Sequence, residues 1–228
     1  GKTTIFTNKR KIFIPTKKIL DEIKSLSPLK IDYITFSGAG EPTLAKNLGR
    51  IIKAIKRVRK VRRGQIRLWR KKIAVLTNSS LMHKKDVQKD LLLADFVAAK
   101  LDAPSQDLFF KINRPKKTAR FTKIIKAIKE FKSKFNGTLA LQIMFVKENR
   151  QYAKQIAKLA KEINADEVQI NTPLRPCAVE PLTEKELNKI MQYFKGMNYV
   201  SVYGTKRKKA EPIDKKATAR RRPIRNNQ

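Results

Sequence analysis

The feature that most restricts the fold of this chain is a regular alternation of short apolar runs with longer amphipathic stretches. The runs have the length and composition of strands. They are Tyr33–Phe36, Ile73–Leu76, Phe96–Leu101, Leu139–Val146, Val168–Ile170 and Tyr199–Tyr203. Strands that are separated by helices pair in parallel through right-handed crossovers. The sequence therefore predicts an α/β fold built on a parallel sheet.

The stretches between these runs carry apolar residues at helical spacing. In residues 121–131 the apolar side chains fall on one face, and lysines occupy the other. The apolar residues are Phe121, Ile124, Ile125, Ile128 and Phe131, and the lysines are Lys123, Lys126, Lys129 and Lys132. Patterns at 152–159 and 187–191 predict two more helices. Ile51, Ile52 and Ile55 continue a helix that we expect to open after Pro42.

A glycine-rich turn, Ser37-Gly38-Ala39-Gly40-Glu41-Pro42, follows the first predicted strand. Two glycines let the backbone approach a ligand closely, because no Cβ stands in the way. A carboxylate beside exposed amides suits a small molecule that carries an amino group. The turn lies at the carboxyl end of a strand, where α/β sheets place their ligands. By itself the motif is equally typical of a tight loop.

Polar residues end the later strands as well. Thr77-Asn78-Ser79-Ser80 follows the second run, and Lys100-Leu101-Asp102 ends the third. Gln142 and Met144 lie on the fourth run, and Gln169-Ile170-Asn171-Thr172-Pro173 ends the fifth. The carboxyl ends of parallel strands meet at one edge, so this layout predicts a barrel or half-barrel with one ligand site at its top. Lys100 and Asp102 are also candidates for an internal ion pair.

These motifs, in this order and spacing, resemble those of radical S-adenosylmethionine (radical SAM) enzymes. The nearest likeness is to the wyosine-synthesis-like or MoaA-like iron–sulfur oxidoreductases, over roughly Gly1 to Arg175. The resemblance implies a partial (β/α)6 barrel. It implies that the amino group of SAM is held by the turn, with Gly38, Gly40, Glu41 and Pro42. It further implies that the ribose or carboxylate of SAM is reached by Asn78, Ser79 and Asp102.

The activity implied by the resemblance is a one-electron reduction of SAM. It gives a 5′-deoxyadenosyl radical that abstracts hydrogen from a substrate, and the protein orients and shields that radical. An electron donor such as ferredoxin or flavodoxin would supply the electron. The sequence names neither the substrate nor a catalytic residue.

The chain departs from the family pattern in its cysteines. Radical SAM enzymes hold a 4Fe–4S cluster through a Cys-x3-Cys-x2-Cys loop, with three thiolates on three irons. This sequence has one cysteine, Cys177, which lies beyond the fifth predicted strand. Gly1-Lys2-Thr3-Thr4 resembles the segment that follows the last cysteine of that loop. We therefore expect the first barrel strand and the cluster loop to be missing. The chain alone should bind no cluster and should not cleave SAM reductively.

Two explanations of this departure are open. The sequence is either an N-terminally incomplete copy of an active enzyme or a degenerate relative that kept the scaffold. The abrupt start without an initiator Met favours the first explanation. The extreme charge favours the second, which corresponds to an alternative function, a catalytically inactive basic scaffold that binds RNA.

The charge is a second constraint on function. The sequence has 54 Lys plus Arg against 19 Asp plus Glu, a net charge of +35. Self-repulsion at this level weakens the compact state unless an anion shields it. Basic residues concentrate at 53–72, around Trp69, and at 206–225. A polyanionic partner is predicted, with RNA such as tRNA as the first candidate. The alternative is that lysines have replaced acids across helix surfaces and serve no partner.

Length and composition set the remaining expectations. The 228 residues, 41% of them hydrophobic, suit one domain with a sizeable core. We expect a barrel-like domain at 1–204 and a basic, disordered tail at 205–228. No apolar stretch approaches the ~20 residues of a membrane span, and no signal-peptide pattern opens the chain. A single cysteine fits a reducing compartment. These observations predict a cytoplasmic protein with no membrane partner.

Overall fold

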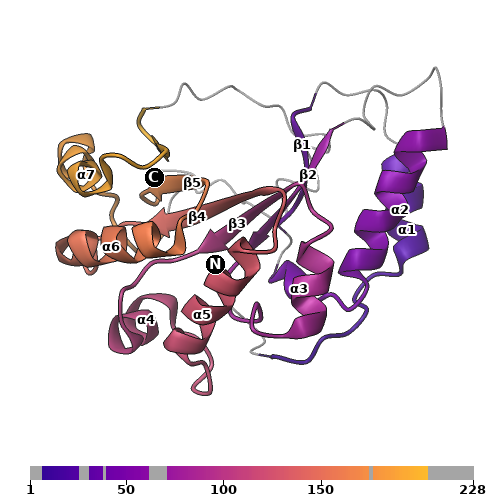
Figure 1. Cartoon of the computed structure of the whole chain (residues 1–228), viewed down its shortest axis with the longest axis horizontal. Coiled ribbons are helices and arrows are strands. Elements are labelled where there is room, and N and C mark those ends of the chain that lie inside the picture. Colours follow the sequence, from indigo (N-terminus) through magenta and orange to yellow (C-terminus); the bar gives the residue numbers. More distant parts are fainter. Residues whose placement is uncertain (1–6, 26–30, 38–39, 62–70, 175–176, 205–228) are drawn as a thin grey trace, which may run out of the picture.

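The computed structural model describes residues 7–25, 31–37, 40–61, 71–174 and 177–204. Six parallel strands form one open sheet, and their order in space is their order along the chain. The strands are β1 (Tyr33–Phe36), β2 (Lys72–Thr77), β3 (Phe96–Lys100), β4 (Thr138–Met144), β5 (Glu167–Asn171) and β6 (Tyr199–Ser201). The predicted α/β class is confirmed. Figure 1 shows the strands fanning out among the helices.

Helices precede β1 and connect the successive strands. They are α1 (Thr16–Ser25), α2 (Leu48–Val61), α3 (Lys85–Leu91), α4 (Gln106–Asn113), α5 (Phe121–Lys132), α6 (Ala153–Ile163) and α7 (Glu184–Met191), with single turns of 3-10 helix at η1 (Pro42–Leu44), η3 (Arg150–Tyr152) and η4 (Gln192–Phe194). α1 and α2 lie side by side next to the β1 edge (Figure 1). Among the described residues, no helix is both long and apolar enough to cross a lipid bilayer.

The two faces of the sheet differ in burial. Right-handed crossovers between adjacent parallel strands place their helices on one face. The strand residues that alternate onto that face, such as Val97, Leu141 and Ile170, are completely buried. On the opposite face Lys100, Gln142 and Gln169 are only half-buried and lie in one row across β3, β4 and β5. This face therefore carries a row of half-buried polar side chains near the carboxyl ends of the strands, while Ala98 and Ala140 on the same face are buried.

The amphipathic helix predicted from residues 121–131 is confirmed as α5, and all five of its apolar residues are buried. The pattern at 187–191 is confirmed within α7, and the one at 152–159 within α6, although Tyr152 belongs to the preceding 3-10 turn. The sequence analysis did not predict α1, α3 or α4. The basic segment at 62–70, with Trp69, and the tail at 205–228 lie outside the described residues.

The helix expected to open after Pro42 does so only for one 3-10 turn. Ala45 is extended (φ −71°, ψ 110°) and forms an isolated parallel bridge with Lys11. The Lys11 amide donates to the Leu44 carbonyl at 3.1 Å, and the Lys46 amide donates to the Lys11 carbonyl at 3.0 Å. These bonds hold the chain out of helical geometry, so α2 begins at Leu48.

Three strands are shorter than the sequence suggested. β3 ends at Lys100, β4 at Met144 and β6 at Ser201. Beyond Lys100 it is the side chain of Asp102, and not a backbone carbonyl, that accepts from the Met144 amide, at 2.9 Å. The polar side chains at the strand ends thus replace part of the ladder. This replacement shapes the candidate site.

Candidate functional site

Glu41 is the centre of the turn that follows β1. Its backbone is extended (φ −78°, ψ 116°), and its side chain caps η1. Oε1 accepts hydrogen bonds from the Thr43 amide (3.0 Å), the Thr43 hydroxyl (2.7 Å) and the Thr77 hydroxyl (2.6 Å). Oε2 accepts one from the Asn78 amide at 2.7 Å. A single carboxylate therefore ties the turn after β1 to the end of β2.

Gly40 leaves open space beside this carboxylate. Among the described residues other than its chain neighbours, no atom lies within 4 Å of a Cβ built on Gly40. A side chain is therefore absent where the turn has free space, and a ligand could approach the Gly40 backbone closely. Pro42 is the first residue of η1, where its fixed φ and missing N–H suit a helix start. Gly38 lies outside the described residues.

Ser79 connects the end of β2 to the end of β3. Its backbone is left-handed (φ 67°), which is uncommon for a residue with a Cβ. Its amide donates to the Thr77 hydroxyl at 3.1 Å, and its hydroxyl donates to the Lys100 carbonyl at 3.1 Å. Ser79 is completely buried, whereas the neighbouring Asn78 is exposed. The tight turn therefore presents Asn78 at the sheet edge.

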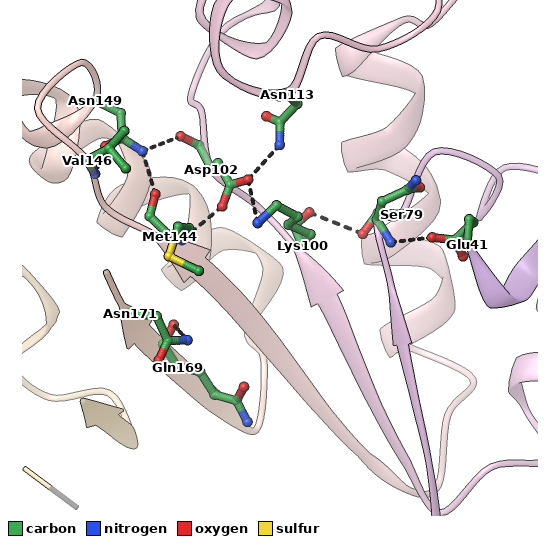
Figure 2. A network of polar contacts seen from close by, with 11 residues as sticks. Glu41, Ser79, Lys100, Asp102, Asn113, Met144, Val146, Asn149, Gln169 and Asn171 are labelled. Carbon is green, nitrogen blue, oxygen red and sulfur yellow. Dashed lines mark hydrogen bonds and ion pairs between the residues drawn. The ribbon is translucent and has the colours of Figure 1, made fainter. Parts of the chain in front are cut away.

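Asp102 is a buried hub, with its side chain 1% exposed. Oδ1 accepts from the Met144 amide at 2.9 Å, and Oδ2 accepts from the Asn113 side-chain amide at 2.5 Å. Lys100 Nζ lies 3.0 Å from Oδ2, which confirms the predicted ion pair. A buried carboxylate needs such donors, because its desolvation is costly. Asp102 thus joins β3, α4 and β4 (Figure 2), and Lys100, 30% exposed, carries the accessible charge.

Two asparagines that the sequence analysis did not single out complete this network (Figure 2). Asn149 is completely buried; its Nδ2 donates to the carbonyls of Asp102 and Met144, each at 2.9 Å, and its Oδ1 accepts from the Val146 amide at 2.8 Å. Asn113 donates to Asp102, while its own Oδ1 is buried and has no hydrogen-bond partner among the described residues. Asn113 reaches Asp102 from the end of α4, a helix that the sequence analysis did not predict, so no local signal pointed to this contact.

Glutamines and an asparagine continue the polar surface onto β4 and β5. Gln142 and Gln169 are paired in register, and Gln142 Nε2 donates to Gln169 Oε1 at 3.3 Å. Asn171 lies one step nearer the carboxyl edge, opposite Met144. Most of the described residues predicted for the site thus gather at one edge of the sheet, joined by contacts from Glu41 to Asn78, Ser79 to Lys100 and Lys100 to Asp102. Their roles toward SAM stay a prediction.

The donor set of this chain does not fit an iron–sulfur cluster. Among the described residues, no group of three or more His, Cys, Asp or Glu side chains could hold a metal ion. Cys177 is exposed, and its thiol lies 3.1 Å from the Val179 carbonyl oxygen. A 4Fe–4S cluster with an open iron needs three thiolates, and the sequence contains one cysteine.

Comparison with known proteins identifies a family. The model of the Radical SAM superfamily matches residues 3–160 of this chain. UPF0026 protein slr1464 of Synechocystis sp. is 38% identical over 177 residues, which cover 77% of this chain and 63% of that protein. UPF0026 protein MJ1312 of Methanocaldococcus jannaschii is 32% identical over 197 residues, which cover 82% and 58%. The chain thus spans about three fifths of the length of these relatives.

A solved structure shares the architecture of the sheet. SuiB of Streptococcus suis, crystallised with S-adenosylmethionine, aligns with a TM-score of 0.60 at 16% identity. The alignment covers 85% of this chain and 45% of SuiB. At this identity the likeness concerns the fold, which is the partial barrel that the motifs predicted.

Proposed function

Because this chain belongs to the radical SAM superfamily, we propose that the carboxyl ends of β1, β2 and β3 form a site for SAM in the core of a radical enzyme. The observation that carries the proposal is the open space at Gly40. It leaves the turn backbone accessible beside a carboxylate that its neighbours hold in place. The family implies SAM and a 4Fe–4S cluster as cofactors.

The turn at Gly40 and Glu41 receives the amino group of SAM in this proposal. A carboxylate oxygen offers about two acceptor positions. Three hydrogen bonds fill Oε1 of Glu41, whereas a single recorded bond leaves Oε2 able to accept another from an ammonium group. Asn78 is exposed next to this oxygen, and Ser79 fixes the turn that presents Asn78.

Asp102 contributes through its neighbour and not by direct contact. Its carboxylate is buried and bonded to three donors, so it has little capacity for a ligand. Lys100 is partly exposed and held by Asp102, and an ammonium group in this position suits the carboxylate of SAM. We assign Lys100 as the cationic contact and Asp102 as its positioning residue.

With one cysteine, this chain does not supply the three thiolate ligands of the cluster. We expect the chain alone to bind SAM without cleaving it reductively. In a protein that also carries three cluster cysteines, SAM would serve as the radical source, and an electron donor such as ferredoxin or flavodoxin would be required.

The test of the SAM site is Gly40→Val. Gly40 is not in the left-handed region, so valine fits the backbone, and its side chain fills the space proposed for the ligand. We expect the affinity for SAM to fall by about tenfold or more, roughly 1.4 kcal/mol. Equilibrium dialysis of the full chain against labelled SAM measures this change. The midpoint of thermal unfolding should stay nearly unchanged, because no protein atom is displaced.

Gly40→Ala is the matched control for volume, and its smaller side chain should cause a smaller loss. Equal affinity for SAM in the unmodified chain and in Gly40→Val would place SAM elsewhere. No saturable binding to the unmodified chain at about millimolar SAM would contradict the site itself.

A further inference from the structure

A groove of about 370 Å³ lies between α2 and α3, and we call it the α2–α3 groove. Its walls carry four cations, which are Arg50, Lys53 and Arg57 of α2 and Lys89 of α3. All four are exposed. Asp90 is the one acid among the described residues that line it. The groove is thus strongly positive and is formed by helices, separately from the polar sheet edge.

Asp90 does not neutralise the groove, because it is bonded to another cation. The guanidinium of Arg10, 7% exposed, bridges Asp90 and Asp86 of α3 and donates to the carbonyls of Thr43 and Ala45. Burial alone lowers the pKa of Arg10, but the bonds to Asp90 and Asp86 outweigh it and leave that pKa above its ordinary value. The negative charge of Asp90 is therefore balanced by Arg10 and does not offset the groove cations.

The four groove cations differ from Arg10 in this respect. Within the part of the chain that the structure describes, none of the recorded ion pairs involves Arg50, Lys53, Arg57 or Lys89. Unpaired cations held along one groove repel one another, and an anion that enters the groove relieves this repulsion. This arrangement is typical of a surface that binds a polyanion.

The close approach of α2 and α3 forms the floor of the groove. A Cβ on Gly49 would lie 2.1 Å from Asp90 Oδ1 and 3.2 Å from Leu93 Cδ1, so only glycine allows this contact. Gly49, Ala54 and Leu93 leave the hollow between the charged side chains. The groove is therefore a direct result of how α2 packs against α3.

We propose that the α2–α3 groove binds the phosphate backbone of a single-stranded nucleic acid. Arg50, Lys53 and Arg57 follow one side of α2 over about 10 Å, at a rise of about 1.5 Å per residue, and Lys89 faces them from α3. A line of flexible cations matches a linear chain of phosphates. An acidic protein surface would call for apolar or aromatic anchors at the centre of the contact. The groove offers only Leu93 of that kind.

The experiment uses the full chain and a fluorescently labelled 20-nucleotide RNA strand, followed by anisotropy over a range of salt concentrations. The groove variant carries Arg50→Gln, Lys53→Gln and Arg57→Gln. The control variant carries Lys154→Gln, Lys158→Gln and Lys161→Gln. The control residues are exposed on α6, make no recorded ion pair among the described residues and change the net charge equally, but they do not line the α2–α3 groove.

We expect the groove variant to lose about tenfold or more in affinity near physiological salt. The slope of log K against log salt should become shallower by about 2, since each lost phosphate contact removes roughly 0.7 for a single strand. The control should lose less than about threefold. A DNA strand of the same sequence should behave like the RNA, because phosphate contacts do not distinguish the two.

Equal losses in both variants would assign binding to diffuse charge and overturn the proposal, as would an unchanged affinity in the groove variant. Competition by polyglutamate as strong as that by unlabelled RNA would overturn the assignment to nucleic acid. Should the triple variant fail to fold by circular dichroism, Lys89→Gln tests the same groove from α3. Its slope should be shallower by about 0.7, and an unchanged slope would contradict the proposal.

Discussion

The α2–α3 groove and the surface of α5 are both rich in cations, but these cations meet different surroundings. On α5, three lysines lie close to carboxylates: Lys126 is 3.9 Å from Glu130, Lys129 is 2.9 Å from Glu162 and Lys132 is 2.5 Å from Asp166. In the described part of the chain, the groove cations have no recorded ion pair. Lysines on α5 therefore form ion pairs within the chain, whereas the lysines and arginines of the groove remain available to bind an anion.

This difference bears on the net charge of +35. The sequence left open whether the lysines serve a polyanionic partner or only cover helix surfaces. The α5 surface fits the second interpretation, because three of its four lysines lie close to acids of the same chain. The α2–α3 groove favours the first. The location of a charge, more than the total, therefore indicates where a partner would bind.

The largest expected effect comes from giving the groove an acid of its own. Ala54 lines the groove between Arg50 and Arg57 on α2, at spacings of four and three residues. Ala54→Glu therefore places a carboxylate within reach of both. We expect the affinity for single-stranded RNA to fall by about ten- to thirtyfold, because the cations gain an internal partner and the phosphates meet a like charge. Anisotropy titration measures the change. An affinity within about twofold of the original would mean that the groove cations do not bind RNA, and that they do not differ from the α5 lysines in this respect.

A smaller effect is expected from closing the approach of the two helices. Gly49→Ala puts a methyl group against Asp90, which Arg10 holds in place, so α2 and α3 must separate. We expect the free energy of unfolding to fall by about 1–2 kcal/mol, measured by urea denaturation. Lys53→Ala on the exposed side of α2 is the control, with a change within about 0.5 kcal/mol. An unchanged free energy of unfolding in Gly49→Ala would show that Asp90 and the two helices can shift to accommodate the methyl group.

The smallest effect concerns the α5 surface and depends on pH. Burial alone raises the pKa of Asp166, but the bonds from Lys132 and the Leu139 amide outweigh it and hold that pKa below its ordinary value of 3.8. A lowered carboxyl pKa stabilises the fold above about pH 4, and this stabilisation is lost as the pH falls through the folded value. Asp166→Asn should therefore cost up to about 1 kcal/mol at pH 7.

The difference between Asp166→Asn and the original chain should shrink below about pH 4, where the original carboxylate becomes protonated. Urea denaturation at a series of pH values measures it. A difference that is constant from pH 7 to pH 3 would mean that packing, and not the charge of Asp166, stabilises this edge of the sheet.

Much of the fold was predictable because local patterns and tertiary packing agree. Phe121, Ile125 and Phe131 share a helical face, and that face is buried in α5. β1 has the predicted bounds, Tyr33–Phe36. α1 was not predicted, although Ile19, Leu20 and Ile23 give it an amphipathic pattern and pack, partly buried, against the core. The helix expected after Pro42 was wrong at its start, since a pairing with the distant Lys11 overrides the local preference.

The candidate site was predictable where its contacts are short-range. Lys100 and Asp102 are two residues apart and form the expected ion pair. The roles of Asn113 and Asn149 depend on helices and loops that return to the same strand end, so no local pattern indicates them. The α2–α3 groove could not be predicted from the sequence either, because it depends on how closely Gly49 lets α3 approach α2.

The strand order has a consequence for how the protein is made. Each strand after β1 pairs with the strand that was synthesised just before it. A strand that leaves the ribosome therefore finds its partner already present and never waits for a later segment to complete the pairing. Pairing between sequence neighbours also keeps the loops that must close short, which lowers the entropic cost of forming the sheet.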